Sequence, residues 1–173
     1  LLRREHALGP WVAPIARWLP CVRAADFTHQ LAPRDAVLSD WIAGENWDSV
    51  KSGMTEEQNA VLWRELAGLL RAVHEVPAPS FGWPHPEAGF DSWSGFLLFA
   101  ARGLLEDFPK LGVDGEEPRD WFEVLEKGTP LLDEVRTPRV LHGDPWPKNV
   151  LIDRTGAQPR IVGLIDHERG LFG

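Results

Sequence analysis

The sequence has 173 residues, of which 43% are hydrophobic and 25% are charged, values typical of a globular protein that buries a core. Lys and Arg number 18 against 26 Asp and Glu, which gives a net charge of -8. We expect no nucleic-acid partner, because an acidic chain repels the phosphate backbone. No apolar run approaches the roughly 18 to 20 residues that span a bilayer, so we expect no membrane association.

We expect the sequence to be a segment of a longer protein. It begins with Leu1 rather than Met and stops at Gly173, shortly after an Asp-containing loop motif. No basic and then apolar leader opens it, and the single cysteine, Cys21, has no partner for an internal disulfide. We therefore expect a cytoplasmic location and interpret Cys21 as a small core residue.

The first part of the chain predicts a helix followed by a hairpin. Apolar residues recur near the helical period over residues 2–19, with Pro10 and Pro14 as interruptions. Residues 21–29 and 36–42 are β-favouring stretches joined by a turn-forming segment, which is typical of a β-hairpin.

Two long helices are predicted next. Thr55 followed three residues later by Gln58 is typical of a capping box, and apolar residues behind it keep helical spacing to residue 73. Ser92 is a second candidate cap, in front of an apolar helix over residues 93–104. The tryptophans within the predicted helices, Trp63, Trp93 and Trp121, are interpreted as packing residues.

The last part of the chain predicts one more helix and then short strands. Residues 121–132 keep helical spacing, whereas 140–142, 150–152 and 160–165 are short apolar runs separated by polar loops. The order of helices and strands therefore indicates a mixed α+β fold.

The most informative segment reads VLHGDPWPKNVLID from Val140 to Asp153. It places Asp144 and Asn149 on a loop between two apolar strands, and two prolines restrict that loop. Another strand then delivers Asp166 at its end. Two carboxylates and an amide oxygen are suitable ligands for Mg²⁺, with one carboxylate left to act as a base.

His-Gly-Asp at residues 142–144 is followed, after four further residues, by Asn149 and later by Ile-Asp at residues 165–166. This pattern resembles the catalytic loop of the aminoglycoside phosphotransferase and choline kinase superfamily. The resemblance implies that Asp144 orients and deprotonates an acceptor hydroxyl, that Asn149 and Asp166 hold Mg²⁺, and that His142 supports the loop. ATP or GTP would be the co-substrate. Protein kinases carry Arg at the position of Gly143, so a protein acceptor is disfavoured.

Two further segments match the same pattern. Glu5 lies in a stretch that resembles the αC helix, whose Glu pairs with a strand Lys that binds the α and β phosphates. Residues 37–44 resemble the fifth strand and the hinge, where backbone groups around Asp40, Trp41 and Ile42 would meet the adenine edge. In the family, a Gly-rich loop and that Lys precede the Glu by roughly 15 to 30 residues, which lies outside this sequence.

The resemblance implies a protein-kinase-like two-lobe fold with a truncated N-lobe and an incomplete helical C-lobe. Residues 1–44 would be the remainder of the N-lobe, with an αC-like helix, two strands and the hinge. Residues 45–173 would form the helical C-lobe with the catalytic loop and the metal-binding Asp.

The expected function is transfer of the γ-phosphoryl group from ATP or GTP to a hydroxyl of a small molecule, most plausibly aminoglycoside-like or otherwise cationic or sugar-like. Choline, ethanolamine, homoserine, fructosamine-type adducts and macrolides remain open as acceptors. Residues 85–135 hold twelve acidic residues and four basic ones. This excess would attract a polycationic acceptor if it lies near the site, and it would equally suit a solvated helix face.

Two other functions stay open. One is a kinase-like nucleotide-binding or regulatory module that lacks a complete phosphate-binding lobe. The other is a metal-dependent hydrolase that uses His142, Asp144, Asp166 and His167. Because neighbouring strand residues point to opposite faces, His167 should point away from Asp166, whereas Glu168 should share its side and support it.

Overall fold

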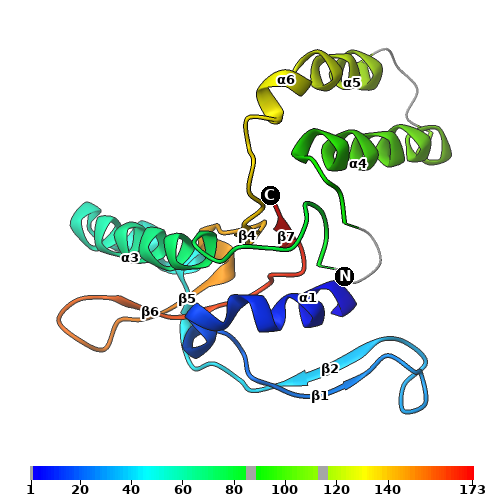
Figure 1. Cartoon of the computed structure of the whole chain (residues 1–173). Helices are drawn as coiled ribbons and strands as arrows, with labels where there is room; N and C mark the ends of the chain where they lie inside the picture. Colours follow the sequence, from blue (N-terminus) through cyan, green and yellow to red (C-terminus); the bar gives the residue numbers. More distant parts are fainter. Residues whose placement is uncertain (1, 85–88, 113–116) are drawn as a thin grey trace.

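The computed structural model describes residues 2–84, 89–112 and 117–173, which combine helices with three small sheets (Figure 1). The α-helices are α1 (Leu2–Leu8), α2 (Trp47–Val50), α3 (Glu56–His74), α4 (Trp93–Asp107), α5 (Glu117–Lys127) and α6 (Thr129–Leu132). Short 3-10 helices are η1 (Gly9–Trp18), η2 (Lys51–Gly53), η3 (Pro109–Leu111) and η4 (Pro147–Asn149). The strands are β1 (Val22–Asp26), β2 (Ala36–Ser39), β3 (Glu45–Asn46), β4 (Val140–Leu141), β5 (Val150–Asp153), β6 (Arg160–Leu164) and β7 (Leu171–Phe172).

The first helical segment is two elements rather than one. The regular helix α1 ends at Leu8, and the chain continues as the 3-10 helix η1, which has Pro10 in its first turn and Pro14 inside it. Proline supplies no backbone N–H and fixes φ, so two prolines at this spacing are incompatible with a continuous α-helix. The apolar face nevertheless persists, because Leu8, Val12 and Ile15 are all buried.

Strands β1 and β2 form the predicted antiparallel hairpin, with shorter strands and a longer loop than expected. The carboxylate of Asp26 fixes the loop by accepting hydrogen bonds from the amides of Thr28 at 2.9 Å and Leu31 at 2.8 Å. The Thr28 hydroxyl, which donates to the same carboxylate at 2.7 Å, and these amides hold the pKa of Asp26 well below its usual range. The prediction that Cys21 is a core residue was wrong, because it lies exposed where the chain enters β1.

Helix α3 confirms the predicted capping box. The Thr55 hydroxyl accepts from the amide of Gln58 at 3.2 Å, and the Gln58 side chain accepts from the amide of Thr55 at 3.0 Å. The buried face of α3 consists of Leu62, Leu66, Leu69 and Val73. This face packs against η1 and β6, so α3 connects the N-terminal segment to the three-stranded sheet that contains β6.

Two small sheets surround the catalytic loop. Strands β3, β5 and β6 form an antiparallel sheet in that order, with Val150 opposite Leu164. Strand β4 pairs with β7, an element that the sequence did not predict. The predicted boundary near residue 44 falls between the β1–β2 hairpin and this three-stranded sheet, and the assignment of two lobes to 1–44 and 45–173 stays a prediction.

Helices α4, α5 and α6 lie together, apart from the sheets, at the top of Figure 1. Ser92 caps α4 as predicted, because its hydroxyl accepts from the amide of Gly95 at 3.1 Å. The single helix predicted over 121–132 is in fact α5 and α6, which meet at Gly128. Trp121 is exposed, which corrects its interpretation as a packing residue, whereas the partly exposed Trp63 packs its ring against Trp47 with centroids 4.6 Å apart.

One hydrophobic core joins these elements around Trp47, which is fully buried. Its buried members come from α1, η1, α2, α3 and the strands: Leu8, Val12, Ile15, Trp47, Leu62, Leu66, Leu69, Val73, Val140, Val150, Ile152, Ile161, Leu164 and Phe172. Within the described ranges, no helix combines the length and apolarity needed to cross a membrane.

Candidate active site

The predicted catalytic loop connects β4 to β5 and is tightly turned. Gly143 has φ of 85°, in the left-handed region that favours glycine. A Cβ atom at this position would overlap the backbone carbonyl of Arg169. The loop and the segment after β6 can therefore touch only because residue 143 has no side chain.

Asp144 and Asn149 face each other across this loop. The side-chain Nδ2 of Asn149 donates to the Asp144 carboxylate at 3.2 Å and to the Asp144 carbonyl at 3.0 Å. Asn149 is buried, whereas Asp144 is partly exposed. Since the amide nitrogen is occupied by Asp144, the amide oxygen on the other side of the group remains for another ligand.

The register of the sheet brings Asp166 to the same place. Val150 pairs with Leu164, and the next amide, that of Ile165, donates to the carbonyl of Asn149 at 2.9 Å. Asp166 then adopts φ of 64°. A left-handed backbone is uncommon for a residue other than glycine and is concentrated at functional sites. The kink follows the end of β6 at Leu164, next to the loop that carries Asn149.

His142 is a structural residue of the loop. It is 1% exposed, and its Nδ1 accepts a hydrogen bond from the amide of Asp144 at 3.3 Å. This bond agrees with the expectation that His142 supports the loop. Burial, together with nearby His167, lowers the pKa of His142 to about 4, so the ring is neutral at pH 7.

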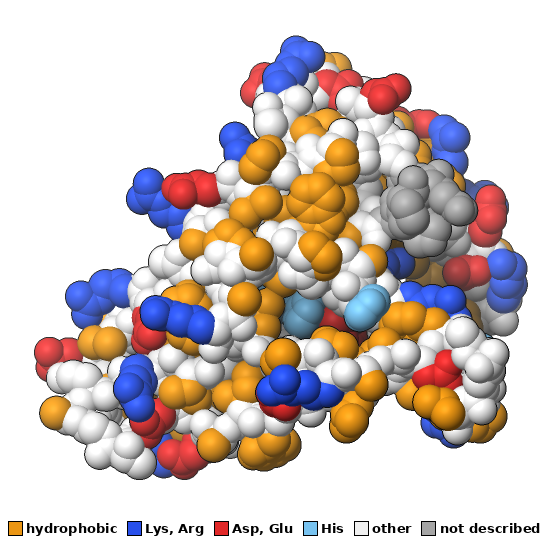
Figure 2. All heavy atoms as spheres, turned by 60° about the horizontal axis from the view of Figure 1, so that its bottom comes forward, with side chains coloured by type: hydrophobic (Ala, Val, Ile, Leu, Met, Phe, Trp, Pro, Cys, Tyr) orange, Lys and Arg blue, Asp and Glu red, His pale blue; other side chains and the backbone are white. Residues whose placement is uncertain are grey.

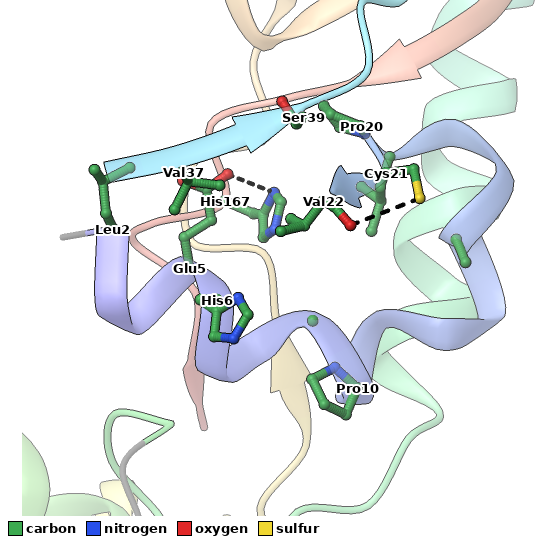
Figure 3. A pocket seen from close by; sticks show the side chains of 13 residues that line it. Leu2, Glu5, His6, Pro10, Pro20, Cys21, Val22, Val37, Ser39 and His167 are labelled. Atoms are coloured by element: carbon green, nitrogen blue, oxygen red, sulfur yellow. Dashed lines mark hydrogen bonds and ion pairs between the residues drawn. The ribbon is translucent and has the colours of Figure 1, made fainter. Parts of the chain in front are cut away.

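Glu5 and His167 approach each other from opposite sides of a pocket of about 370 Å³ (Figure 3). Oε1 of Glu5 lies 3.5 Å from Nδ1 of His167. Burial and the charge of Asp166 raise the pKa of Glu5, and burial lowers the pKa of His167. On the face drawn in Figure 2, histidine and acidic side chains lie together in a hollow bordered by hydrophobic ones.

Glu168 and Arg169 complete the turn. A hydrogen bond with the Asp166 side chain raises the pKa of Glu168, which agrees with the expectation that the two share a side. Nε of Arg169 lies 4.0 Å from Oδ2 of Asp144. Sequence reasoning missed Arg169, and no local signal marks it, because its proximity depends on how the two loops pack.

The predicted hinge residues do not behave alike. The Asp40 side chain forms an ion pair with Arg23, and its amide donates to the Cys21 carbonyl at 2.9 Å, so this amide cannot meet a base. Trp41 is 89% exposed. Ile42 instead packs against β6, where its side chain fills the space beside Gly163. The adenine-edge role of the backbone around Asp40, Trp41 and Ile42 stays a prediction.

Another residue that the sequence did not single out is Asn46. Its Nδ2 donates to the carbonyl of Lys148 in the catalytic loop at 2.5 Å, and its Oδ1 accepts from the amide of Ser49 at the start of α2. One side chain thus fixes both the catalytic loop and a helix terminus. Its signal was the helix-capping preference of Asn, which the sequence analysis did not use.

The donor set beside Asp144 fits a hard divalent cation. Asn149 and Asp166 offer an amide oxygen and a carboxylate, which are ligands that Mg²⁺ accepts while keeping water and phosphate oxygens in its shell. Across residues 2–84, 89–112 and 117–173, no group of three or more His, Cys, Asp or Glu side chains is placed to share an ion.

The architecture is shared with solved aminoglycoside phosphotransferases. The gentamicin complex of APH(2'')-IIa matches with a TM-score of 0.65 and 18% identity, covering 99% of this chain and 55% of that one. The streptomycin-ATP ternary complex of the same enzyme gives 0.66 and 18%, and ADP-bound APH(2'')-Ib gives 0.63 and 17%, each covering 99% of this chain and 56% of that one. The fold is thus the kinase-like fold of these enzymes, and the chain spans just over half their length.

The family assignment comes from the sequence itself. A model of the phosphotransferase enzyme family matches residues 1–173, and the chain belongs to this family. A sequence comparison with curated proteins finds no match. The predicted superfamily and fold class are therefore confirmed.

Proposed function

We propose that this chain carries the catalytic base and the metal ligands of a phosphotransferase that moves the γ-phosphoryl group of ATP or GTP to a hydroxyl of a small molecule. The observation that carries the proposal is the placement of Asp144. Its carboxylate accepts from Asn149 at 3.2 Å and still lies partly exposed, next to the kinked turn that presents Asp166. A base for an incoming hydroxyl must be both fixed and reachable.

The chemistry assigned to these residues is in-line phosphoryl transfer. Asp144 orients the acceptor hydroxyl and takes its proton while the hydroxyl oxygen bonds to the γ-phosphorus. The bond from that phosphorus to the β–γ bridging oxygen breaks, and a nucleoside diphosphate leaves. Asn149 and Asp166 would hold Mg²⁺, which neutralises charge on the phosphate oxygens when it is bound. His142 keeps the loop in shape, and its buried ring, whose pKa is lowered to about 4, is neutral at pH 7.

We propose a cationic or sugar-like acceptor of the aminoglycoside kind. Two similar structures hold gentamicin or streptomycin, and ATP or ADP is present in two of the three. The acidic excess of residues 85–135 would attract a polycation. Arg169, 4.0 Å from the Asp144 carboxylate, acts in the opposite direction at short range. An acceptor that places a neutral, hydroxyl-bearing ring beside Asp144 and Arg169, and its amines nearer to the acidic residues, suits both charge environments.

The test is nucleotide consumption by the protein that carries this chain, with any native flanking sequence, in the presence of Mg²⁺. ATP and GTP are each offered with aminoglycosides, choline, homoserine and simple sugars. We expect turnover with one acceptor class and its loss in Asp144→Asn. Nucleotide binding without turnover on any acceptor would instead favour a regulatory module, and the absence of nucleotide binding would refute the proposal.

A further inference from the structure

His167 is a buried polar residue with an incomplete hydrogen-bond arrangement. It is 7% exposed, and its Nδ1 is buried without a hydrogen-bond partner among the described residues. A buried nitrogen in this state is costly, and such groups in native proteins call for an explanation. Oε1 of Glu5 lies 3.5 Å from this nitrogen, and Figure 3 shows the two side chains pointing toward each other from α1 and from the turn after β6.

The backbone of this turn is already fixed against α1. The carbonyl of His167 accepts from the amide of Gly170 at 2.9 Å. Gly170 in turn lies so close to Leu8 that a Cβ would overlap the leucine side chain. Glu5 and Leu8 are three residues apart and therefore share one face of α1. One face of α1 therefore makes an apolar contact with the turn through Leu8 and a polar contact through Glu5.

These two contacts do different work. Leu8 against Gly170 sets how near α1 lies to the turn, but an apolar contact does not select one orientation of Glu5. Selecting that orientation takes a polar partner. Among the described residues that line the pocket, His167 is the one placed within ion-pair distance of Glu5.

We infer that His167 is a positioning residue, whose Nδ1–H donates to the Glu5 carboxylate and so orients α1 against the turn that carries Asp166 when nucleotide binds. Hydrogen bonds of this kind are often long in the unliganded protein and shorten in the complex, in keeping with the 3.5 Å separation. The inference rests on the proposed function, since it is nucleotide that uses this orientation.

The experiment is a double-mutant cycle on nucleotide affinity. Calorimetry measures the dissociation constant of Mg·ATP for the wild type, His167→Phe, Glu5→Gln and the double variant, all with any native flanking sequence. His167→Phe keeps an aromatic ring of similar volume without a donor, whereas His167→Asn returns an amide N–H near the position of Nδ1. His6→Phe is the matched control, because His6 lies on the same helix and lines the same pocket but stacks against Phe27.

We expect His167→Phe and Glu5→Gln each to weaken Mg·ATP binding roughly 5- to 30-fold. The double variant should be no weaker than the worse single one, since both remove the same bond. His167→Asn should recover most of the loss, and His6→Phe should bind like the wild type. If the ring had only a structural role, His167→Phe would bind Mg·ATP with the affinity of the wild type.

Three results overturn the inference: wild-type affinity in His167→Phe, a double variant whose loss is the product of the single losses, or an Asn variant as weak as the Phe variant. The proposed function fails differently, through a wild type that transfers phosphate to no acceptor. If the affinities still follow the cycle in that case, the positioning role stands. A wild type that does not bind Mg·ATP overturns both.

Discussion

Asn149 donates one side-chain N–H group to the carboxylate of Asp144 and one to its carbonyl, at 3.2 and 3.0 Å. The residue assigned to the metal therefore also holds the residue assigned as the base. Two functions that the sequence places five positions apart are joined in one buried amide group. Substitutions at residue 149 can separate them.

Asn149→Asp keeps an oxygen ligand but replaces the donating amide with a carboxylate next to Asp144. Two like charges at hydrogen-bond distance repel, so the base should lose its orientation. We expect the Mg²⁺ concentration for half-maximal rate to change little and the rate at saturating Mg²⁺ to fall by at least about 10-fold. Asn149→Ala should lose both the metal ligand and the hydrogen bond to Asp144, so it should need more Mg²⁺ and also react more slowly at saturating Mg²⁺. Steady-state kinetics with varied Mg²⁺ distinguishes them, and full activity in Asn149→Asp would show that the amide hydrogen bond is dispensable.

Asp166 combines function with backbone strain, because its φ is 64°. Removing the carboxylate should abolish Mg²⁺-dependent turnover in both Asp166→Ala and Asp166→Gly. The two should differ in stability, since glycine adopts this conformation freely and alanine does so at a cost of about 1–2 kcal/mol. Urea unfolding should therefore find the Gly variant more stable than the Ala variant. Equal stability would mean that the strain is relieved elsewhere.

Gly143 should be intolerant of any side chain. With φ of 85° and the Arg169 carbonyl in the position of a Cβ, Gly143→Ala should lose about 1–3 kcal/mol of unfolding free energy. Gly68→Ala in the middle of α3 is the matched control, because the space around its Cβ is open. That variant should gain about 0.5–1 kcal/mol. Changes of opposite sign in the unfolding free energies of the two variants support the loop geometry. An unchanged unfolding free energy in Gly143→Ala contradicts it.

The buried imidazole of His142 makes stability depend on pH. Its pKa falls from 6.5 to about 4 on folding, so the unfolded chain binds the extra proton between these values. Stability should thus be complete above pH 6.5 and decline as pH falls toward 4, by as much as about 3 kcal/mol. His142→Gln has no group to titrate, so its unfolding free energy should decline less over the same range. Parallel pH profiles for the two proteins would refute the burial effect.

Local signals allowed much of this to be predicted from the sequence. The capping box at Thr55 and Gln58 involves residues three apart, and the motif around Asp144 lies within one short loop, so neither depends on the rest of the fold. The family pattern then added the expectation that Asp166 lies nearby. The sheet register, with Ile165 bonded to Asn149, is what places it there.

Contacts between distant segments could not be predicted in this way. Asn46 bonds to Lys148 across 102 positions, and Arg169 reaches Asp144 only because Gly143 lets two loops touch. The expectation that His167 points away from Asp166 assumed a continuing strand. Strand β6 ends at Leu164, Asp166 has a left-handed backbone, and the imidazole of His167 lies 3.5 Å from Glu5, a contact that strand alternation alone could not predict.

Asp144→Asn, studied by nucleotide affinity and single-turnover transfer together, tests the assignment of the catalytic base most directly. Glu75→Gln is the control, because its exposed carboxylate lies outside residues 85–135 and pairs with Arg71 one helical turn away. We predict that Asp144→Asn binds Mg·ATP within about two-fold of the wild type but transfers the phosphoryl group at least about 100-fold more slowly. Transfer at a rate close to that of the wild type and of Glu75→Gln would contradict the role of Asp144 as the base.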